Sequence, residues 1–326
     1  MDRSRIPVAL ALALAVFSIV LAAVRIGRSS QESSFTVERS SFFDAGRSGI
    51  ARIRVHGMIQ GGKAPGEAGS ERIIALIREA EQADAIRGVI LDIDSGGGET
   101  GATKQIYEAV KELKKKKPVI TVIGGVAASG GYYIASASDR IFALETSIVG
   151  SIGVISLHPN IAGLLDKVGI RMQTMKTGPH KDSSYPFRDL SAEEQQMYAD
   201  LLDDSYRVFI ADVSEGRKQS QKTVEEWADG KIYSGKKAKA LQMIDDIGGE
   251  REALAAMKLL LKTDEDLPIY EPEPDFFEEL FSSFPSNRFQ ARMPSPSFPA
   301  SGLYYLYPSA DFVERFLSSQ PLIETR

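Results

Sequence analysis

The sequence from residue 118 to residue 138, PVITVIGGVAASGGYYIASAS, joins a β-like run to a helix-like run. The apolar run 118–124 is the strand signal, and the run 132–138 is the helical one. Ser129 lies between them, among small residues that leave its hydroxyl accessible. The N–H groups that follow Ser129 are free at a helix start, where they can stabilise an oxyanion. The stretch therefore indicates a serine nucleophile on a strand-to-helix turn.

Alternating strand and helix signals precede this turn. They run in the order strand, helix, strand, helix, at residues 50–55, 70–83, 88–94 and 100–116. This alternation predicts an α/β fold with a mainly parallel sheet and right-handed crossovers. Sites in such sheets form at the carboxyl ends of the strands. The glycine loop Ser95-Gly-Gly-Gly98 and Ser129 both lie at such ends, so we expect them to meet.

The remainder of the chain carries weaker signals. We expect strands at residues 140–143, 153–157 and 171–177, and helices at residues 161–168, 191–215 and 250–262. The helix at 191–215 opens with the capping box Ser191-Ala-Glu-Glu194. From residue 271 onward the composition shifts to Pro, Ser and aromatic residues, which indicates a mostly irregular tail that docks on another surface.

The N-terminus contains an uncharged run, residues 6–24, that is apolar apart from Ser18 and long enough to span a bilayer. A cleaved secretory signal stays open as the alternative, although Ala22-Ala-Val-Arg25 is a poor cleavage site. Both readings place most of the chain outside the cytoplasm. The predicted layout is a cytoplasmic stub at 1–5, an anchor at 6–24, a linker at 25–47, a catalytic domain at 48–270 and the tail at 271–326.

Composition removes several classes of function. The net charge of −5 gives no support for nucleic-acid binding. The chain has no cysteine, which excludes disulfides, thiolate metal sites and a thiol nucleophile. The glycine loop lacks the Gly-Lys-Ser/Thr of a P-loop and does not read Gly-x-Gly-x-x-Gly. We therefore expect neither a metal nor a cofactor.

The general base is less certain from the residues alone. The histidines are His56, His158 and His180, of which the first two suit structural positions. His180 adjoins Lys181 in a turn-rich loop, so either side chain is a candidate. A lysine acts as a base only when its amine is neutral, which requires burial or nearby cations. The glycine loop could provide the second oxyanion donor, with Gly97 first, or the oxyanion hole of an acyl-CoA enzyme.

The chain resembles the signal peptide peptidase A family of membrane-anchored serine peptidases. The resemblance covers residues 50–262 and rests on RVHGMI (54–59), GVILDIDSGGG (88–98), AASGGYYIA (127–135), GSIGV (150–154), GPHKD (178–182), PFR (186–188), DGKIYSG (229–235) and IDDIG (244–248). It implies a Clp protease or crotonase-like fold. The family usually has proline where this chain has Gly96, which would leave the loop more flexible.

The resemblance implies a role for each matching residue. Ser129 matches the nucleophile, Lys181 the general base and Ser151 the serine that orients the lysine amine. Gly97 and Gly130 match the oxyanion hole. The implied function is a serine endopeptidase of the bacterial inner membrane, single-pass with an extracytoplasmic catalytic domain, that degrades remnant signal peptides.

The resemblance also implies assembly into a homo-oligomeric ring with inward-facing sites.

Three alternatives for the function remain open at this point. They are a Ser-His peptidase that uses His180, a crotonase-like acyl-CoA enzyme, and an inactive scaffold that binds membrane partners through the tail.

Overall fold

The computed structural model describes residues 47–62, 69–272 and 304–306. The predicted stub, the anchor at 6–24, nearly all of the linker and most of the tail lie outside the described residues. Within the described ranges, no helix combines the length and the apolar character needed to cross a bilayer.

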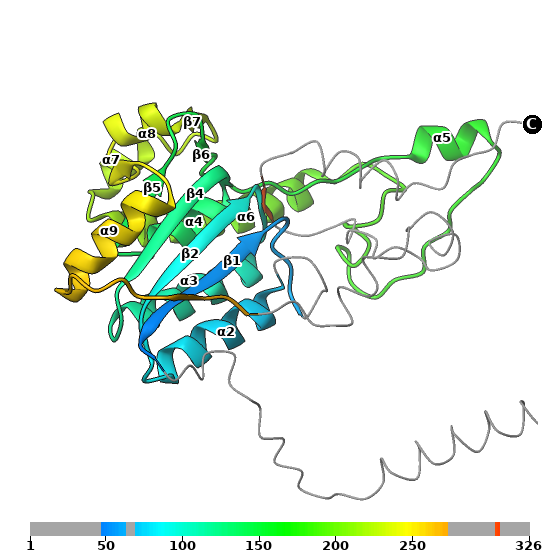
Figure 1. Cartoon of the computed structure of the whole chain (residues 1–326). Helices are drawn as coiled ribbons and strands as arrows, with labels where there is room; N and C mark the ends of the chain where they lie inside the picture. Colours follow the sequence, from blue (N-terminus) through cyan, green and yellow to red (C-terminus); the bar gives the residue numbers. More distant parts are fainter. Residues whose placement is uncertain (1–46, 63–68, 273–303, 307–326) are drawn as a thin grey trace, which may run out of the picture. The chain divides into compact units, whose positions relative to one another are not determined.

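A mainly parallel sheet forms the centre of the described chain (Figure 1). Its main path runs β7-β6-β4-β2-β1-β9, and β5 pairs with β4 and β8. Every pairing is parallel except β6 with β7. The bounds are β1 Gly49–His56, β2 Ile86–Ser95, β4 Val119–Ala128, β5 Arg140–Ala143, β6 Ile148–Gly150, β7 Ile232–Ser234, β8 Asp246–Ile247 and β9 Ile269–Tyr270. The predicted α/β class is confirmed.

A second, small sheet joins distant parts of the chain. The strand β3 (Gly97–Glu99) follows β2 almost directly and pairs antiparallel with β10 (Tyr304–Leu306) from the tail. The described part of the tail therefore docks on the glycine loop.

Helices cover both faces of the main sheet. Their bounds are α2 Ser70–Gln82, α3 Thr100–Lys114, α4 Gly130–Ser136, α5 Ala162–Lys167, α6 Ala192–Arg217, α7 Gln221–Glu225, α8 Gly235–Ala240 and α9 Glu250–Leu261. Apolar residues of α2, α3, α4 and α6 form the larger hydrophobic core. The apolar side of α9 packs on the opposite face, against Ile90 and Ile120. Because β2 is covered on both faces, its apolar residues are nearly continuous rather than alternating.

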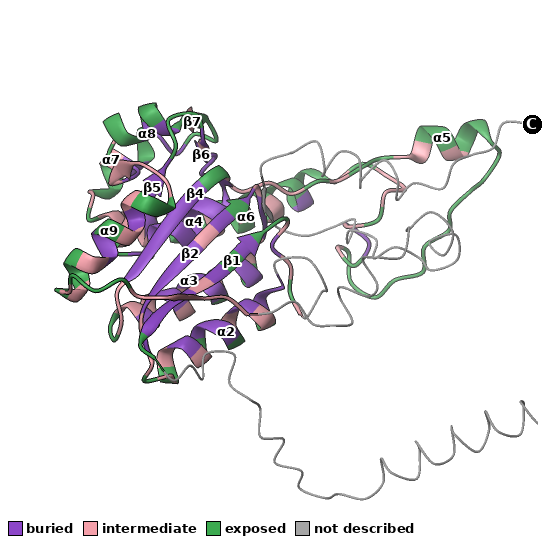
Figure 2. Ribbon diagram, viewed as in Figure 1, coloured by how far each residue is buried: buried purple, intermediate pink, exposed green. Residues whose placement is uncertain are grey.

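The segment between residues 155 and 190, here called the arm, differs from the rest. It contributes no residue to either hydrophobic core, and only Asp182 and Ser183 in it are buried (Figure 2). The predicted helix at 161–168 is confirmed as α5. The strands predicted at 153–157 and 171–177 are wrong. Residues 171–179 are exposed and lie outside every strand pairing of the described chain, so their apolar residues have no sheet to join.

Candidate active site

Ser129 occupies the turn between β4 and α4, as predicted. Its φ of 52° and ψ of −115° are unusual for a residue with a side chain. A conformation of this kind costs roughly 1–3 kcal/mol and is found mainly at functional sites. Ser129 is 1% exposed, and no described residue provides a hydrogen-bond partner for its Oγ. The hydroxyl is thus buried and has no partner among the described residues, so the prediction that its small neighbours leave it accessible is wrong for the single chain.

Aromatic side chains fix the helix that begins at Ser129. The Tyr132 hydroxyl donates to the carbonyl of Met243 at 2.9 Å. The Tyr133 ring stacks on Phe209 with centroids 4.3 Å apart, and its hydroxyl donates to the Asp212 carboxylate. These contacts attach α4 to α6 and to the loop that follows α8, and so fix the orientation of the turn.

Two glycines allow α4 to approach the glycine loop. A Cβ on Gly130 would lie 2.8 Å from Thr103 Oγ1, 3.1 Å from Gly97 Cα and 3.2 Å from Gly98 N. A Cβ on Gly131 would lie 2.6 Å from the carbonyl oxygen of Ser95. Side chains at these positions would push the two segments apart. The structure therefore brings Gly97, Gly98 and Gly130 together, as the two strand ends led us to expect.

The hydrogen bonds of the loop distinguish its N–H groups. The Gly97 N–H donates to Ser95 Oγ at 3.1 Å, and that hydroxyl donates to the Gly57 carbonyl at 2.6 Å. The Ile59 N–H donates to the Gly97 carbonyl, and the Ile59 carbonyl accepts from the Glu99 N–H, both at 2.9 Å. The polar groups of Gly98, between them, point to the opposite edge of β3. Sequence reasoning put Gly97 first and missed Gly98, whose N–H is the one in the loop that faces the edge of β3 opposite Ile59.

The tail occupies this edge of β3. Leu306 is opposite Gly97, Tyr305 opposite Gly98 and Tyr304 opposite Glu99, in antiparallel register. Main-chain pairing of this kind does not depend on particular side chains. The edge beside Ser129 can therefore bind an extended peptide.

Ser151 lies close to Ser129 through the backbone. The Ser129 N–H donates to the carbonyl of Gly150 at 2.7 Å, and Ala128 pairs with Gly150 in the β4–β6 register. Ser151 also has a φ of 52°, and its N–H donates to the carbonyl of Lys231 at 2.6 Å. The two predicted serines thus stand on adjacent turns at the carboxyl ends of neighbouring strands.

Lys181 lies in the arm and is exposed. It lines a hollow of about 450 Å³. The other residues around this hollow are Thr174, Met175, Lys176, Thr177, Asp182 and Tyr185. Among the described residues, none forms an ion pair or a hydrogen bond with the Lys181 amine. A single chain therefore does not join Lys181 to Ser129.

The histidines have other partners. His56 lies 3.3 Å from Asp92, whose hydrogen bond raises the pKa of His56. His158 Nε2 lies 2.9 Å from Ser156 Oγ. His180 faces the carboxylates of Glu193 and Glu194, each at 3.6 Å. None of the three forms a hydrogen bond with Ser129 Oγ, so within one chain no histidine is paired with the predicted nucleophile.

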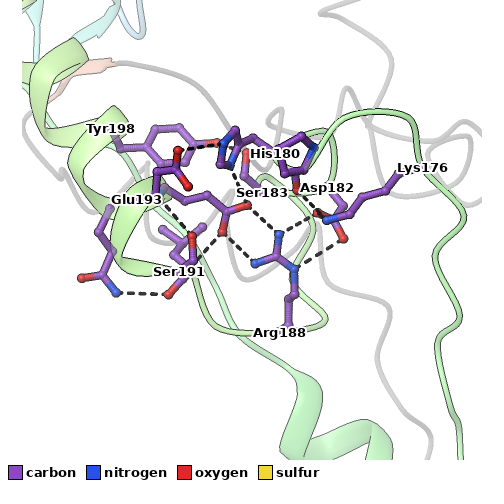
Figure 3. A network of polar contacts seen from close by, with 12 residues as sticks. Lys176, His180, Asp182, Ser183, Arg188, Ser191, Glu193 and Tyr198 are labelled. Carbon is purple, nitrogen blue, oxygen red and sulfur yellow. Dashed lines mark hydrogen bonds and ion pairs between the residues drawn. The ribbon is translucent and has the colours of Figure 1, made fainter.

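A polar network surrounds the carboxylate of Asp182, the residue after Lys181 in the chain (Figure 3). Arg188 donates to Asp182 at 2.6 Å through Nη2 and to Glu194 at 2.7 Å through each Nη. Lys176 donates to Asp182 at 2.5 Å. Arg188, followed by Lys176, holds the pKa of Asp182 well below its usual range. Arg188, followed by the Ser191 N–H, lowers the pKa of Glu194 to about 2.

Family comparisons point to proteolysis. The family model described as Peptidase family S49 matches residues 111–264, and the model described as Clp protease matches residues 50–149. The second match agrees with the parallel sheet and its flanking helices. The two ranges overlap over residues 111–149, which include β4, Ser129 and α4.

Several curated proteins are similar to this chain. A protein of Synechocystis sp., provisionally named a protease, is 37% identical over 64% of this chain and 72% of its own length. One of Enterococcus faecium, provisionally named signal peptide peptidase SppA, is 35% identical over 58% of this chain and 55% of its own. The chloroplastic serine protease SPPA of Arabidopsis thaliana is 33% identical over 65% of this chain and 32% of its own length. The chain thus spans only part of the length of these relatives.

Proposed function

Because the chain belongs to peptidase family S49 and is a serine peptidase of the SppA type, we propose that it cleaves peptides with Ser129 as nucleophile and Lys181 as general base. The observation that carries this assignment is Ser129 itself. It has a strained backbone, a buried hydroxyl without a partner, and a helix start and a glycine loop on either side. The unpaired Lys181 amine is the base candidate that the resemblance implies.

The mechanism is acyl transfer. The neutral Lys181 amine takes the Ser129 proton while Oγ bonds to the peptide carbonyl carbon, and the carbonyl becomes a tetrahedral oxyanion. The C–N bond then breaks, and the lysine ammonium returns its proton to the leaving amine. Water, deprotonated by the same amine, hydrolyses the acyl-enzyme and frees Ser129. Ser151 follows Gly150, whose carbonyl accepts from the Ser129 N–H, and is therefore suited to orient the lysine amine.

The oxyanion is held by backbone N–H groups. Gly130, at the start of α4, provides one N–H. The resemblance implies Gly97 for the other, but within one chain the Gly97 N–H already donates to Ser95 Oγ, so it can serve only when that bond is released, and the neighbouring Gly98 N–H is the second candidate. The close approach of Gly130 to Gly97 and Gly98 supports this location. Removing one such donor commonly costs about 3 kcal/mol of transition-state stabilisation. Peptide substrate would bind along β3, in the position where the tail pairs.

Assembly is part of this proposal. We place the complete site between copies of the chain in a homo-oligomeric ring, with the serine from one copy and the lysine from a neighbour. Support comes from the exposed Lys181 and from the apolar surface of the arm. The exposed apolar residues of the arm are Leu157, Leu164, Val168, Ile170, Met172, Met175 and Tyr185. An arm with so much exposed apolar surface suits contact with another subunit.

The test of assembly uses two inactive variants. Ser129→Ala and Lys181→Met chains are purified separately and then mixed under conditions that allow subunit exchange. Mixed rings would contain sites with both intact residues, so peptidase activity should return. If exchange is verified by labelled subunits and activity stays absent, the two residues belong to one chain or to no common site.

The substrate class and the location rest on sequence. The Enterococcus faecium relative carries the name of a signal peptide peptidase. Together with the uncharged run at residues 6–24, this supports a single-pass enzyme of the bacterial inner membrane. Its catalytic domain would face outward and degrade remnant signal peptides or other membrane-associated peptides. Protease treatment of spheroplasts, which should digest residues 48–270 only if they face outward, tests the orientation.

The chemical assignment is tested with a fluorophosphonate label. The label should attach to Ser129 in the wild-type chain and disappear in Ser129→Ala. Lys181→Met should abolish peptidase activity and His180→Ala should retain it, whereas the reverse result would favour the Ser-His alternative. Absence of labelling in an assembled, folded enzyme would exclude Ser129 as an activated nucleophile.

A further inference from the structure

The carboxylate of Asp182, next to Lys181 in the chain, is already occupied. It is 7% exposed, and it accepts hydrogen bonds from Lys176 at 2.5 Å and from Arg188 at 2.6 Å. Lys176 also donates to the Pro179 carbonyl at 2.6 Å, which anchors that amine within the same turn. The anion closest to Lys181 in the chain therefore has two cationic partners, neither of which is Lys181.

Arg188 also connects the arm to α6. Its two Nη groups bind the two oxygens of Glu194, each at 2.7 Å. Glu194 is 1% exposed and belongs to the capping box with Ser191, so its position is fixed by the start of α6. A guanidinium bound to two carboxylates in this way is geometrically specific, and an ammonium cannot replace it.

The other charged groups nearby are also accounted for. From the arm these are His180, whose ring faces Glu193 and Glu194, and Asp189, whose side chain binds Asn160. From α6 the group is Glu193, which is largely exposed and lies 3.6 Å from His180. The phenol of Tyr185 lines the same hollow as Lys181. Among the described residues, Lys181 thus has no anionic partner, while the carboxylate of Asp182, which lines the same hollow, is bound by Lys176 and Arg188.

We infer that Arg188 is a positioning residue for Lys181. Arg188 neutralises Asp182 together with Lys176, and it also neutralises Glu194. By binding Glu194 it fixes the loop that carries Lys181 to the start of α6. The inference rests on the proposed role of Lys181 as general base. An anionic partner holds a lysine in its charged form, in which it cannot take a proton. By occupying both carboxylates, Arg188 leaves the Lys181 amine able to act as a base.

The decisive experiment measures kcat, KM and the pH dependence of kcat/KM in the full-length assembled enzyme, with a fluorogenic peptide. In Arg188→Gln, Asp182 loses one of its two cationic partners and becomes able to bind Lys181. The rising limb of kcat/KM should move to higher pH by about one unit or more. At neutral pH kcat should fall about tenfold or more, with KM nearly unchanged. Arg207→Gln, an exposed arginine of α6 paired with Asp203, is the matched control and should behave as wild type.

A second-site change separates electrostatics from structure. In Arg188→Gln/Asp182→Asn the carboxylate adjacent to Lys181 in the chain is absent, while Glu194 keeps its bond from the Ser191 N–H, so the rising limb should return toward its wild-type pH. A purely structural role for Arg188 would give no such return. Arg188→Lys keeps the positive charge but cannot bind both carboxylates as the guanidinium does. The rising limb of kcat/KM should therefore stay near its original pH while kcat falls.

The outcomes distinguish this inference from the proposed function. If Lys181→Met retains activity, the lysine mechanism itself is wrong. If Lys181→Met is inactive while Arg188→Gln keeps the wild-type profile and rate, the positioning role alone is wrong. If Arg188→Gln does not assemble, Arg188→Lys and Asp182→Asn take its place. The inference is supported if the rising limb of kcat/KM in Asp182→Asn lies at unchanged or lower pH. It is overturned if that limb moves to higher pH.

Discussion

The backbone N–H of Ser129 donates to the carbonyl oxygen of Gly150 at 2.7 Å, and Ser151 is the next residue in the chain. This bond joins two turns in which the serine has the same φ, 52°. The turns close neighbouring parallel strands, β4 and β6. Two serines from separate turns of the sequence are thereby held on adjacent turns of the structure, the arrangement that the proposed nucleophile and its proposed supporting residue would need.

Replacing Ser151 tests that relationship. Ser151→Ala removes the hydroxyl that would orient the lysine amine, and the loss of one such hydrogen bond should lower kcat about tenfold. The backbone turn should persist, because its Ser151 N–H and Gly150 carbonyl bonds do not use the side chain. Steady-state kinetics and thermal unfolding measure both effects. Ser156→Ala, which removes a hydroxyl of the arm that contacts His158, is the control.

Gly130 should not tolerate a side chain. In Gly130→Ala the new Cβ would meet Gly97 Cα at 3.1 Å and Gly98 N at 3.2 Å, so the oxyanion segments would separate. We expect at least a hundredfold loss of kcat/KM, the usual scale for a lost oxyanion donor. Gly101→Ala in α3 has open space around the new Cβ and should keep full activity. Equal activity of the two variants would contradict the assigned location of the oxyanion hole.

A proline at position 96 should be accepted and should stiffen the glycine loop. Gly96 is not among the residues with positive φ, and none of the described hydrogen bonds uses its N–H. The substitution Gly96→Pro reduces the freedom of the unfolded chain and should stabilise the fold by about 0.4–1 kcal/mol. Chemical denaturation measures this. A loss of stability would show that the loop needs the conformational freedom of glycine.

The tail should compete with peptide substrates for β3. Tyr305 is opposite Gly98, so Tyr305→Pro removes a main-chain donor from this pairing and should weaken it. Because the edge is then vacant more often, KM for a short peptide should fall while kcat stays constant. Ser309→Pro, outside the described strand, is the comparison variant. An unchanged KM would mean that substrate binds elsewhere.

Acid should release the arm from α6. The pKa values of Asp182 and Glu194 are lowered, that of Glu194 to about 2, chiefly by Arg188. A carboxyl with a lowered pKa stabilises the fold above its ordinary pKa, and this stability is lost as pH falls through the folded value. The network should therefore stay intact from pH 5 to pH 9 and weaken below about pH 4. Hydrogen exchange of residues 176–194 measures this, and Arg188→Gln should shift the weakening to higher pH.

The sequence was sufficient for most of the fold and for the location of Ser129, the proposed nucleophile, on a strand-to-helix turn. Apolar runs such as Val89 to Ile93 are typical of strands buried on both faces, and the glycines around Ser129 indicate a close approach of two backbone segments. Local signals failed in the arm. Residues 171–177 have the composition of a strand, but no strand lies beside them in the described part of the chain, and strand formation depends on such a neighbour.

The tertiary structure decided which groups meet. Sequence alone could place Gly97 and Gly130 at strand ends, but only the register of β3 against Ile59 turns Gly98 toward the edge that pairs with β10. Likewise, Lys181 and Asp182 are adjacent in sequence, whereas the partners of Asp182 depend on the path of the arm and the start of α6. Hydrophobic periodicity encodes which face of an element is buried. The direction of an individual N–H or carboxylate is set by contacts with distant segments, which local patterns do not encode.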